Sequence, residues 1–239
     1  MTNEKKICYK GIGDVLYRRN PRARNIAIRI NSEGFVKVTV PGRCKIERAE
    51  KFVIEKGGWI VQKREKIRQN RRENLLWEPG AIVNMLQGRI FIEQGTGGGF
   101  EVSVLGNSYG IQVPANFNSG DPLFAKAVYE HIALIGKNEG KLQLPGVLSQ
   151  CAETYDLPFT KVTVRRMKTR WGSCSSKNNI SLNSSLVFLP EELIRYVCLH
   201  ELVHTIHKNH GRVFWEALID ILPEALMLRK ELRKQTIIA

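Results

Sequence analysis

The sequence predicts an α+β protein of two domains, on the basis of three patterns. Apolar and polar residues alternate in the first part of the chain, as in β-strands, whereas apolar residues recur at helical spacing in the second. Residues 1–72 hold 20 Lys and Arg against 7 Asp and Glu, whereas residues 73–239 hold 17 against 16. With 43% hydrophobic and 25% charged residues, the composition is that of a globular protein. We therefore expect a basic, β-rich domain over residues 1–118 and a second domain over residues 119–239.

The first domain should contain several strands and one helix. Residues 25–30 and 35–40 both alternate, and turn-forming residues join them, which predicts a β-hairpin. Apolar residues at near-helical spacing over residues 46–68 predict an amphipathic helix with a basic solvated face and a weak point at Gly57 and Gly58. Residues 81–93 and 100–113 should form further short strands.

The second domain should begin with helices. Apolar spacing predicts one helical stretch over residues 124–135 and another over residues 147–155, followed by strands at residues 162–164 and 180–183. Pro190 and the carboxylates after it mark the start of a long helix, which should run to about Asn209. Gly211 suits the turn after this helix, and a last helix begins near Phe214.

The sequence also excludes some classes of protein. No run of about 18 apolar residues occurs, so we expect no membrane span, and the N-terminus lacks a signal peptide's apolar stretch. The five cysteines are odd in number and dispersed, and no pair has the short spacing of a zinc ribbon or a redox motif. A reducing, cytoplasmic setting is the expectation.

The chemistry of the chain is concentrated in one histidine-rich segment. Four of the five histidines lie within residues 200–210, and the sequence His200-Glu201-Leu202-Val203-His204 places two of them one helical turn apart. Two such imidazoles can bind one Zn²⁺ at about 2.0–2.1 Å. Glu201 lies beside them on the helix and is predicted to act as the general base on a zinc-bound water. The alternative is a core helix with histidines along its polar edge.

A catalytic zinc needs a third protein ligand. His207 lies on the same helical stripe but about 10 Å along the axis from His200, too far to share the ion. His210 precedes Gly211, and a left-handed glycine there would turn the chain back towards the metal. We therefore predict His200, His204 and His210 as ligands of one Zn²⁺, with His207 exposed or supporting a ligand.

These residues and those just upstream resemble the YgjP-like metallopeptidase family. The family's segments correspond to Arg170–Cys174, Ile180–Asn183, His200–His204 and His210–Trp215 of this chain, in the same order and spacing. The one departure is Gly211, where serine is more usual and where the related SprT-like proteases have glycine. The resemblance implies a zincin-like catalytic domain, with a small sheet, an active-site helix and a C-terminal helix, that hydrolyses peptides or proteins.

The upstream segment has two interpretations. The strand formed by Ile180, Ser181, Leu182 and Asn183 is predicted to be an edge strand that pairs with a substrate peptide. Arg170 and Trp171 either contact the substrate or hold this segment against the helix. Cys174 is not predicted as a ligand, because three histidines suffice.

The basic N-terminal part also has two interpretations. Its Arg and Lys clusters are typical of a surface that binds nucleic-acid phosphates, and they include Arg18, Arg19, Arg22, Arg24, Lys63, Arg64 and Arg68. The alternative is a solvated surface that binds nothing, since glutamates are interleaved with the basic residues of the helix. If nucleic acid binds here, the chain is a nucleic-acid-associated protein with a structural zinc, or a protease that acts on DNA-bound proteins.

Overall fold

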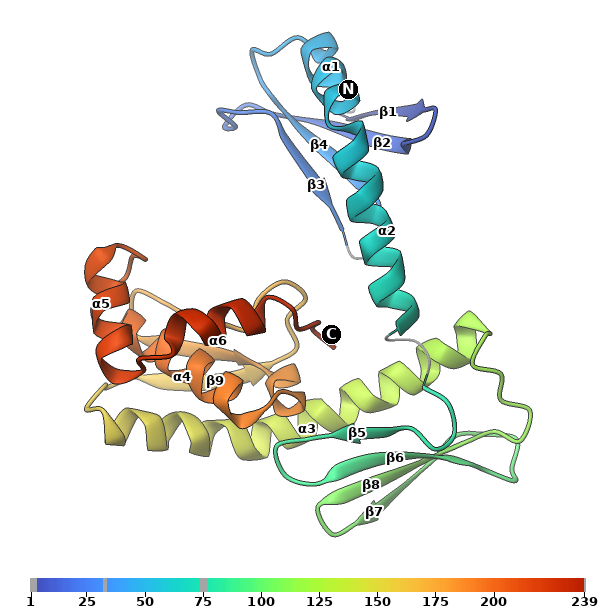
Figure 1. Ribbon diagram of the computed structural model, residues 1–239, viewed down its shortest axis with the longest axis vertical. Helices are drawn as coiled ribbons and strands as arrows, with labels where there is room; N and C mark the ends of the chain where they lie inside the picture. The colour runs from blue at the N-terminus through green and yellow to red at the C-terminus, as the bar shows by residue number, and fades with distance from the viewer. Residues whose placement is uncertain (1–3, 32–33, 74–76, 239) are drawn as a thin grey trace. The chain divides into compact units, whose positions relative to one another are not determined.

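A computed structural model describes residues 4–31, 34–73 and 77–238, apart from the side chains of residues 68–73. The chain divides into two compact units, Met1–Leu76 and Trp77–Ala239. Both contain helices and strands, which confirms the α+β class (Figure 1). The division between the units does not coincide with the boundary predicted between residues 118 and 119.

The N-terminal unit is a four-stranded sheet packed against two helices. The strands lie in the order β1-β2-β4-β3. The elements are β1 (Glu4–Tyr9), β2 (Gly13–Asn20), β3 (Ala27–Ile30), β4 (Val36–Pro41), α1 (Ile46–Glu55) and α2 (Gly57–Glu73). The predicted hairpin is confirmed, since β3 and β4 pair antiparallel with Ile28 opposite Val38. The prediction did not include β1 and β2, of which β2 pairs with β4 in parallel.

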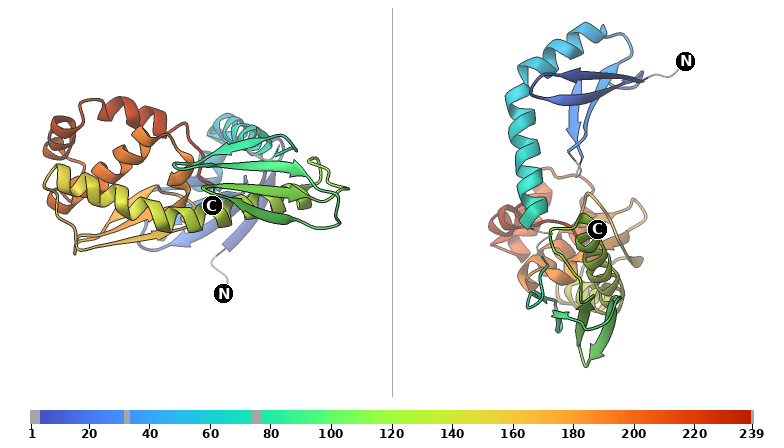
Figure 2. Two further views of the ribbon diagram at one scale, coloured as in Figure 1. Left: turned by 90° about the horizontal axis from the view of Figure 1, so that it is seen from below. Right: turned by 90° about the vertical axis from the view of Figure 1, so that its right-hand side faces the viewer.

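The single helix predicted over residues 46–68 is in fact two helices that meet at an angle (Figure 2). The break falls at Lys56, one residue before the predicted weak point at Gly57 and Gly58. A Cβ atom at Gly57 would lie 3.1 Å from Cδ1 of Ile12. Glycine therefore lets the start of α2 approach the turn between β1 and β2.

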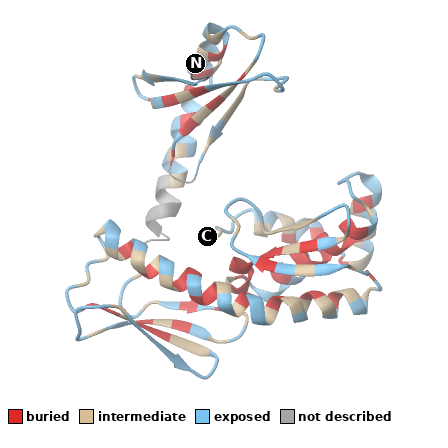
Figure 3. Cartoon of the chain, turned by 180° about the vertical axis from the view of Figure 1, so that it is seen from behind, coloured by how far each residue is buried: buried red, intermediate tan, exposed pale blue. Residues whose placement is uncertain are grey.

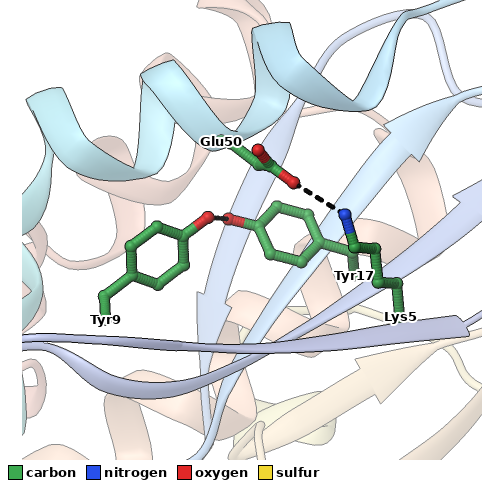
Figure 4. A network of polar contacts seen from close by, with 4 residues as sticks. All are labelled: Lys5, Tyr9, Tyr17 and Glu50. Atoms are coloured by element: carbon green, nitrogen blue, oxygen red, sulfur yellow. Dashed lines mark hydrogen bonds and ion pairs between the residues drawn. The ribbon is translucent and has the colours of Figure 1, made fainter.

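A small polar network joins the sheet of this unit to α1 (Figure 4). The hydroxyls of Tyr9 and Tyr17 lie 2.7 Å apart, and Nζ of Lys5 lies 3.1 Å from Oε1 of Glu50. Burial raises the pKa of the Tyr17 phenol, and the hydrogen bond with Tyr9 raises it further. The Tyr17 hydroxyl therefore stays protonated and holds β2 to β1.

The second unit begins with another four-stranded sheet. Its strands lie in the order β5-β6-β8-β7 and are β5 (Ile82–Asn84), β6 (Arg89–Gln94), β7 (Glu101–Leu105) and β8 (Ser108–Val113). The buried face of this sheet, which includes Ile90, Ile92 and Ile111, shares one core with Val128 and Ile132 of the next helix. The short strands predicted over residues 81–93 and 100–113 are therefore present, as β5 to β8.

That next helix, α3 (Pro122–Thr154), runs unbroken for 33 residues through Pro145, where two helical stretches were predicted. Its first half packs on the sheet through Val128 and Ile132, and its second half enters a different core through Leu144 and Leu148. Buried positions accordingly recur along its whole length (Figure 3). One helix therefore contributes to both cores of the second unit. No helix in the described part of the chain is long and apolar enough to cross a membrane.

The remaining elements surround the second core. A three-stranded sheet has the order β10-β11-β9, in which β11 pairs antiparallel with β10 and parallel with β9. The elements are β9 (Lys161–Arg165), β10 (Gly172–Cys174), β11 (Asn179–Asn183), the 3-10 helix η1 (Ser184–Phe188), α4 (Glu191–Ile206), α5 (Arg212–Ile221) and α6 (Ala225–Leu232). Helix α3 contacts β9, α4 contacts β10 and β11, and the two helices contact each other, so the sheet and both helices share one core.

Candidate metal centre

Helix α4 carries the His-Glu-x-x-His motif. Pro190 precedes its first residue and Glu191 lies in its first turn, as the sequence predicts. The apolar side of the helix is fully buried, with Cys198, Leu199 and Leu202 inaccessible to solvent. This burial fixes the rotation of the helix and turns its histidines to the opposite side.

The structure brings together the three histidines that were predicted as ligands. Nε2 of His210 lies 2.9 Å from Nε2 of His200 and 3.1 Å from Nε2 of His204. Two nitrogens bound at 2.0–2.1 Å to a tetrahedral zinc lie roughly 3.3–3.4 Å apart, so the spacing suits one such ion. Within the described residues, these three histidines are the only cluster of His, Cys, Asp or Glu side chains close enough to share a metal.

The predicted reason for the position of His210 is wrong. Helix α4 ends at Ile206, three residues earlier than expected, and the chain reverses between His207 and His210. Gly211 is extended, with φ −75° and ψ −177°, and caps the start of α5. The reversal therefore needs no left-handed glycine.

His207 supports the centre through its backbone. Its carbonyl oxygen lies 2.9 Å from Nδ1 of His204 and accepts a hydrogen bond from it. The proton of a neutral His204 then sits on Nδ1, which leaves the lone pair of Nε2 facing His210. A cation between the rings would satisfy this lone pair, and the donor set therefore fits a metal.

An aromatic ring lies against all three histidines. The ring centroid of Phe214 is 4.9 Å from that of His200, 4.5 Å from that of His204 and 4.8 Å from that of His210. Phe214 is itself almost wholly buried. Burial, together with the neighbouring His204 and His210, lowers the pKa of His200 to about 3. Burial also lowers the pKa of His204, so both rings are neutral at pH 7 and can bind a metal.

Glu201 is buried beside the histidines and packs against the backbone of β10. A Cβ atom at Gly172 would lie 2.6 Å from Oε1 and 2.7 Å from Cγ of Glu201, so only glycine fits there. Burial raises the pKa of Glu201 to about 7, and the charge of Arg170 opposes this rise. A carboxyl group with a pKa near neutrality is suited to accept and return a proton. This role of Gly172 could not be predicted from the sequence, because it depends on contact between distant segments.

The prediction of an edge strand at residues 180–183 is wrong. Strand β11 is the middle strand, so its backbone pairs on both sides, and Ile180 and Leu182 are buried in the core. Ser181, between them, is partly buried in the same strand. The edge strand next to Glu201 is β10, and it begins at Gly172.

Asn183 cannot bind a substrate, because its side chain is buried and fully engaged. Its Nδ2 donates to the carbonyls of Met167 and Arg170 at 2.7 and 2.9 Å. Its Oδ1 accepts hydrogen bonds from the amides of Ser185 and Met167. The backbone N–H of Asn183 also donates a hydrogen bond to the carbonyl of Trp171 at 2.8 Å. Asn183 therefore holds the segment that leads into β10.

Arg170 and Trp171 divide between the two interpretations. Trp171 packs on the core that contains α4, as the structural interpretation expects. The Arg170 side chain is exposed, and its charge reaches Glu201.

Nζ of Lys208 binds Oδ1 of Asn178 and the carbonyl of Ser175, which ties the turn carrying His210 to the β10–β11 turn.

The basic residues of the N-terminal unit have several different environments. Arg19 donates to the carbonyls of Gly42 and Cys44, and Arg64 donates to the carbonyl of Ile12. Nε of Arg18 lies 3.6 Å from Oε1 of Glu4. Arg22, Arg24 and Lys63 are exposed, and the side chain of Arg68 lies outside the described residues. Arg19 and Arg64 therefore stabilise the fold, and only part of the predicted phosphate-binding set is free.

A histidine cluster on a buried helix, with a buried carboxylate beside it, defines the active centre of a metal-dependent peptidase. A family described as "YgjP-like, metallopeptidase domain" matches residues 24–235. The chain belongs to this YgjP-like family.

Two solved structures of metallopeptidase zymogens are also similar to the chain. Jannalysin of Methanocaldococcus jannaschii is 23% identical with a TM-score of 0.35, over 38% of this chain and 95% of the other. Abylysin of Pyrococcus abyssi is 21% identical with a TM-score of 0.36, over 40% of this chain and 99% of the other. A search of curated proteins gave no match.

Proposed function

We propose that the chain is a zinc peptidase of the zincin type, in which His200, His204 and His210 hold one Zn²⁺ and Glu201 is the general base. The observation that carries this proposal is the convergence of three imidazole Nε2 atoms beside a buried carboxylate. Free cysteines throughout the chain fit a reducing compartment, and we place the protein in the cytoplasm.

Held by His200, His204 and His210, a zinc ion would supply Lewis-acid chemistry for the peptide carbonyl and for water near neutral pH. Glu201 accepts a proton from the attacking water at its carboxylate and passes it to the leaving amine. Gly172 keeps the carboxylate in place from one side, and the Asn183 hydrogen bonds keep Gly172 in place. The carbonyl of His207 orients the His204 ring.

The substrate peptide is expected to lie along β10. This strand pairs with β11 on one side only, so its other backbone edge is available to an extended peptide. Because Gly172 of β10 touches Glu201, a peptide paired there would pass close to the general base.

Three variants test the proposed mechanism. Glu201→Gln should abolish hydrolysis of an unfolded protein substrate and leave one zinc bound per chain, as measured by metal analysis. His204→Ala should lose the zinc. His207→Ala is the matched control and should keep both zinc and activity, because it retains the backbone carbonyl that binds His204. Full activity in zinc-loaded Glu201→Gln would refute the mechanism.

A structural zinc is the alternative role for this site. Structural sites are closed by four protein ligands, whereas catalytic sites keep a position open. In the described part of the chain, three side chains converge, and Cys174 is not among them. The donor set therefore favours catalysis.

A second candidate function, nucleic-acid binding through the N-terminal unit, is supported by the exposed Arg22, Arg24 and Lys63. It would bring the peptidase to DNA-bound proteins, as the SprT-like resemblance suggests. Each phosphate neutralised on double-stranded DNA should contribute about −0.9 to the slope of log affinity against log salt. A slope near zero would exclude binding to nucleic-acid phosphates. The same slope after Arg22→Gln and Arg24→Gln would exclude these two residues as phosphate contacts.

A further inference from the structure

Three side chains gather on the His200 side of the metal centre. Tyr196 lies one helical turn before His200 on α4, with the two ring centroids 5.8 Å apart. The ring centroid of Trp215 lies 6.1 Å from that of His200 and 5.9 Å from that of His210. The guanidinium carbon of Arg229, on α6, lies 4.4 Å from the Trp215 ring centroid. Together the two Trp215 distances place the Arg229 guanidinium at most about 10.5 Å from the His200 ring.

The polar groups of this cluster have unused hydrogen-bonding capacity. Tyr196 is 3% exposed; its hydroxyl has no hydrogen bond to another residue in the described part of the chain and is not among the buried atoms that lack a partner, so it reaches solvent. Arg229 is half-buried and forms no ion pair among the described residues, whereas Arg212 on α5 pairs with Glu216 at 2.9 Å. A stacked guanidinium loses little conformational freedom when it binds a ligand.

These groups suit a carboxylate. A guanidinium binds a carboxylate through two parallel N–H donors, and a phenol adds a third donor. The rings of Tyr196 and Trp215 lie 5.8 and 6.1 Å from that of His200, and Arg229 stacks on Trp215, so the phenol and the guanidinium belong to one cluster beside this histidine. The aromatic face of Trp215 fixes the guanidinium and keeps water from one side of it.

We propose that Tyr196, Trp215 and Arg229 form a subsite that binds a carboxylate of the substrate peptide. One residue of extended peptide spans about 3.3–3.6 Å. Because the guanidinium lies at most about 10.5 Å from the His200 ring, the carboxylate would lie within about three residues of the cleaved bond. The carboxylate is either the C-terminus of the peptide or the side chain of an Asp or Glu at that position. The proposal rests on the proposed peptidase function and adds the substrate class to it.

Binding measurements separate this subsite from catalysis. The probes are three acetylated peptides of one sequence: one with a free C-terminal carboxylate, one with a C-terminal amide, and one amide with a glutamate next to the end. Their affinity for zinc-loaded Glu201→Gln protein is measured by calorimetry. The free acid should bind at least about tenfold more tightly than the plain amide, because the contact is a charge-assisted pair. Equal affinity of the acid and both amides would overturn the subsite.

Variants test which residues carry the preference. Arg229→Gln should abolish the preference for the acid, Tyr196→Phe should reduce it, and Lys230→Gln, which removes an exposed charge from the same helix, should leave it unchanged. Tyr196→Phe keeps the ring and so serves as the second variant if Arg229→Gln does not fold. An unchanged preference in folded Arg229→Gln, or in Tyr196→Phe if that is the variant available, would refute the proposal.

The same peptides distinguish a C-terminal carboxylate from a side-chain carboxylate, and they distinguish the subsite from the peptidase activity. Tight binding of the glutamate amide identifies a side-chain carboxylate, whereas tight binding of the free acid alone identifies the C-terminus. Hydrolysis of these peptides by the wild type tests the peptidase separately. A carboxylate preference without hydrolysis would contradict the proposed function and support the subsite.

Discussion

Replacement of Gly172 by alanine should disable Glu201 without removing the metal. The new methyl group would lie 2.6 Å from Oε1, 2.7 Å from Cγ and 2.9 Å from Cδ of Glu201, whereas ordinary contact begins at 3.4 Å. The carboxylate must therefore move by about 0.8 Å or rotate away. A misplacement of about 1 Å at a reacting group costs about 100-fold in rate. We expect kcat to fall by about that factor.

The assay is steady-state hydrolysis of a peptide substrate, together with metal analysis. Because the three atoms nearest to the new methyl group all belong to Glu201, zinc content should stay at the wild-type level. Gly211→Ala is the control: Gly211 adjoins His210, but a Cβ there meets nothing within 4 Å and its backbone is extended. Wild-type kcat in Gly172→Ala, or loss of zinc from it, would refute the reasoning.

Three further results are expected. Gly136→Ala should destabilise the protein, because its Cβ would lie 2.4 Å from the Phe188 ring. In the same helix, a Cβ at Gly146 would meet nothing within 4 Å, so Gly146→Ala should stabilise the protein by about 0.5–1 kcal/mol. Urea unfolding that ranks the two variants the other way would contradict this expectation. Asn183→Ala should lower the free energy of unfolding by about 3–5 kcal/mol, because it leaves buried backbone groups unpaired. A loss of less than about 1 kcal/mol, measured by thermal unfolding, would contradict the role of these hydrogen bonds. In chelator-treated protein, the pKa of His200 is lowered from an ordinary 6.5 to about 3, so the fold favours the neutral ring. The free energy of unfolding should therefore be highest above pH 6.5 and should fall as the pH drops from 6.5 towards 3. In His200→Phe this part of the pH dependence should be absent.

The metal centre could be predicted from sequence because its parts are local. Two of the predicted ligands lie one turn apart on a helix, and the third lies just after the helix ends. Even so, the prediction assigned the reversal of the chain to Gly211, because glycine signals a possible left-handed turn and does not require one.

The contacts around the centre could not be predicted in this way, since they depend on the order of strands in the sheet. The alternation of Ile180, Ser181 and Leu182 indicates a strand but not which strands pair with it. The edge strand next to Glu201, Gly172–Cys174, is only three residues long and has no alternation to detect. The continuity of α3 was also hidden, because Pro145 interrupts the helical pattern while burial on both sides of it keeps the helix intact.

The shared helix α3 has a consequence for how the second unit unfolds. Since its first half completes the core under β5–β8 and its second half completes the core around α4, neither core can lose the helix without exposing apolar surface of the other. Amide protons along α3 should therefore exchange with solvent in one cooperative event. A fragment that begins at residue 119 would leave Val128 and Ile132 uncovered and should aggregate, whereas a fragment that begins at Trp77 retains both cores.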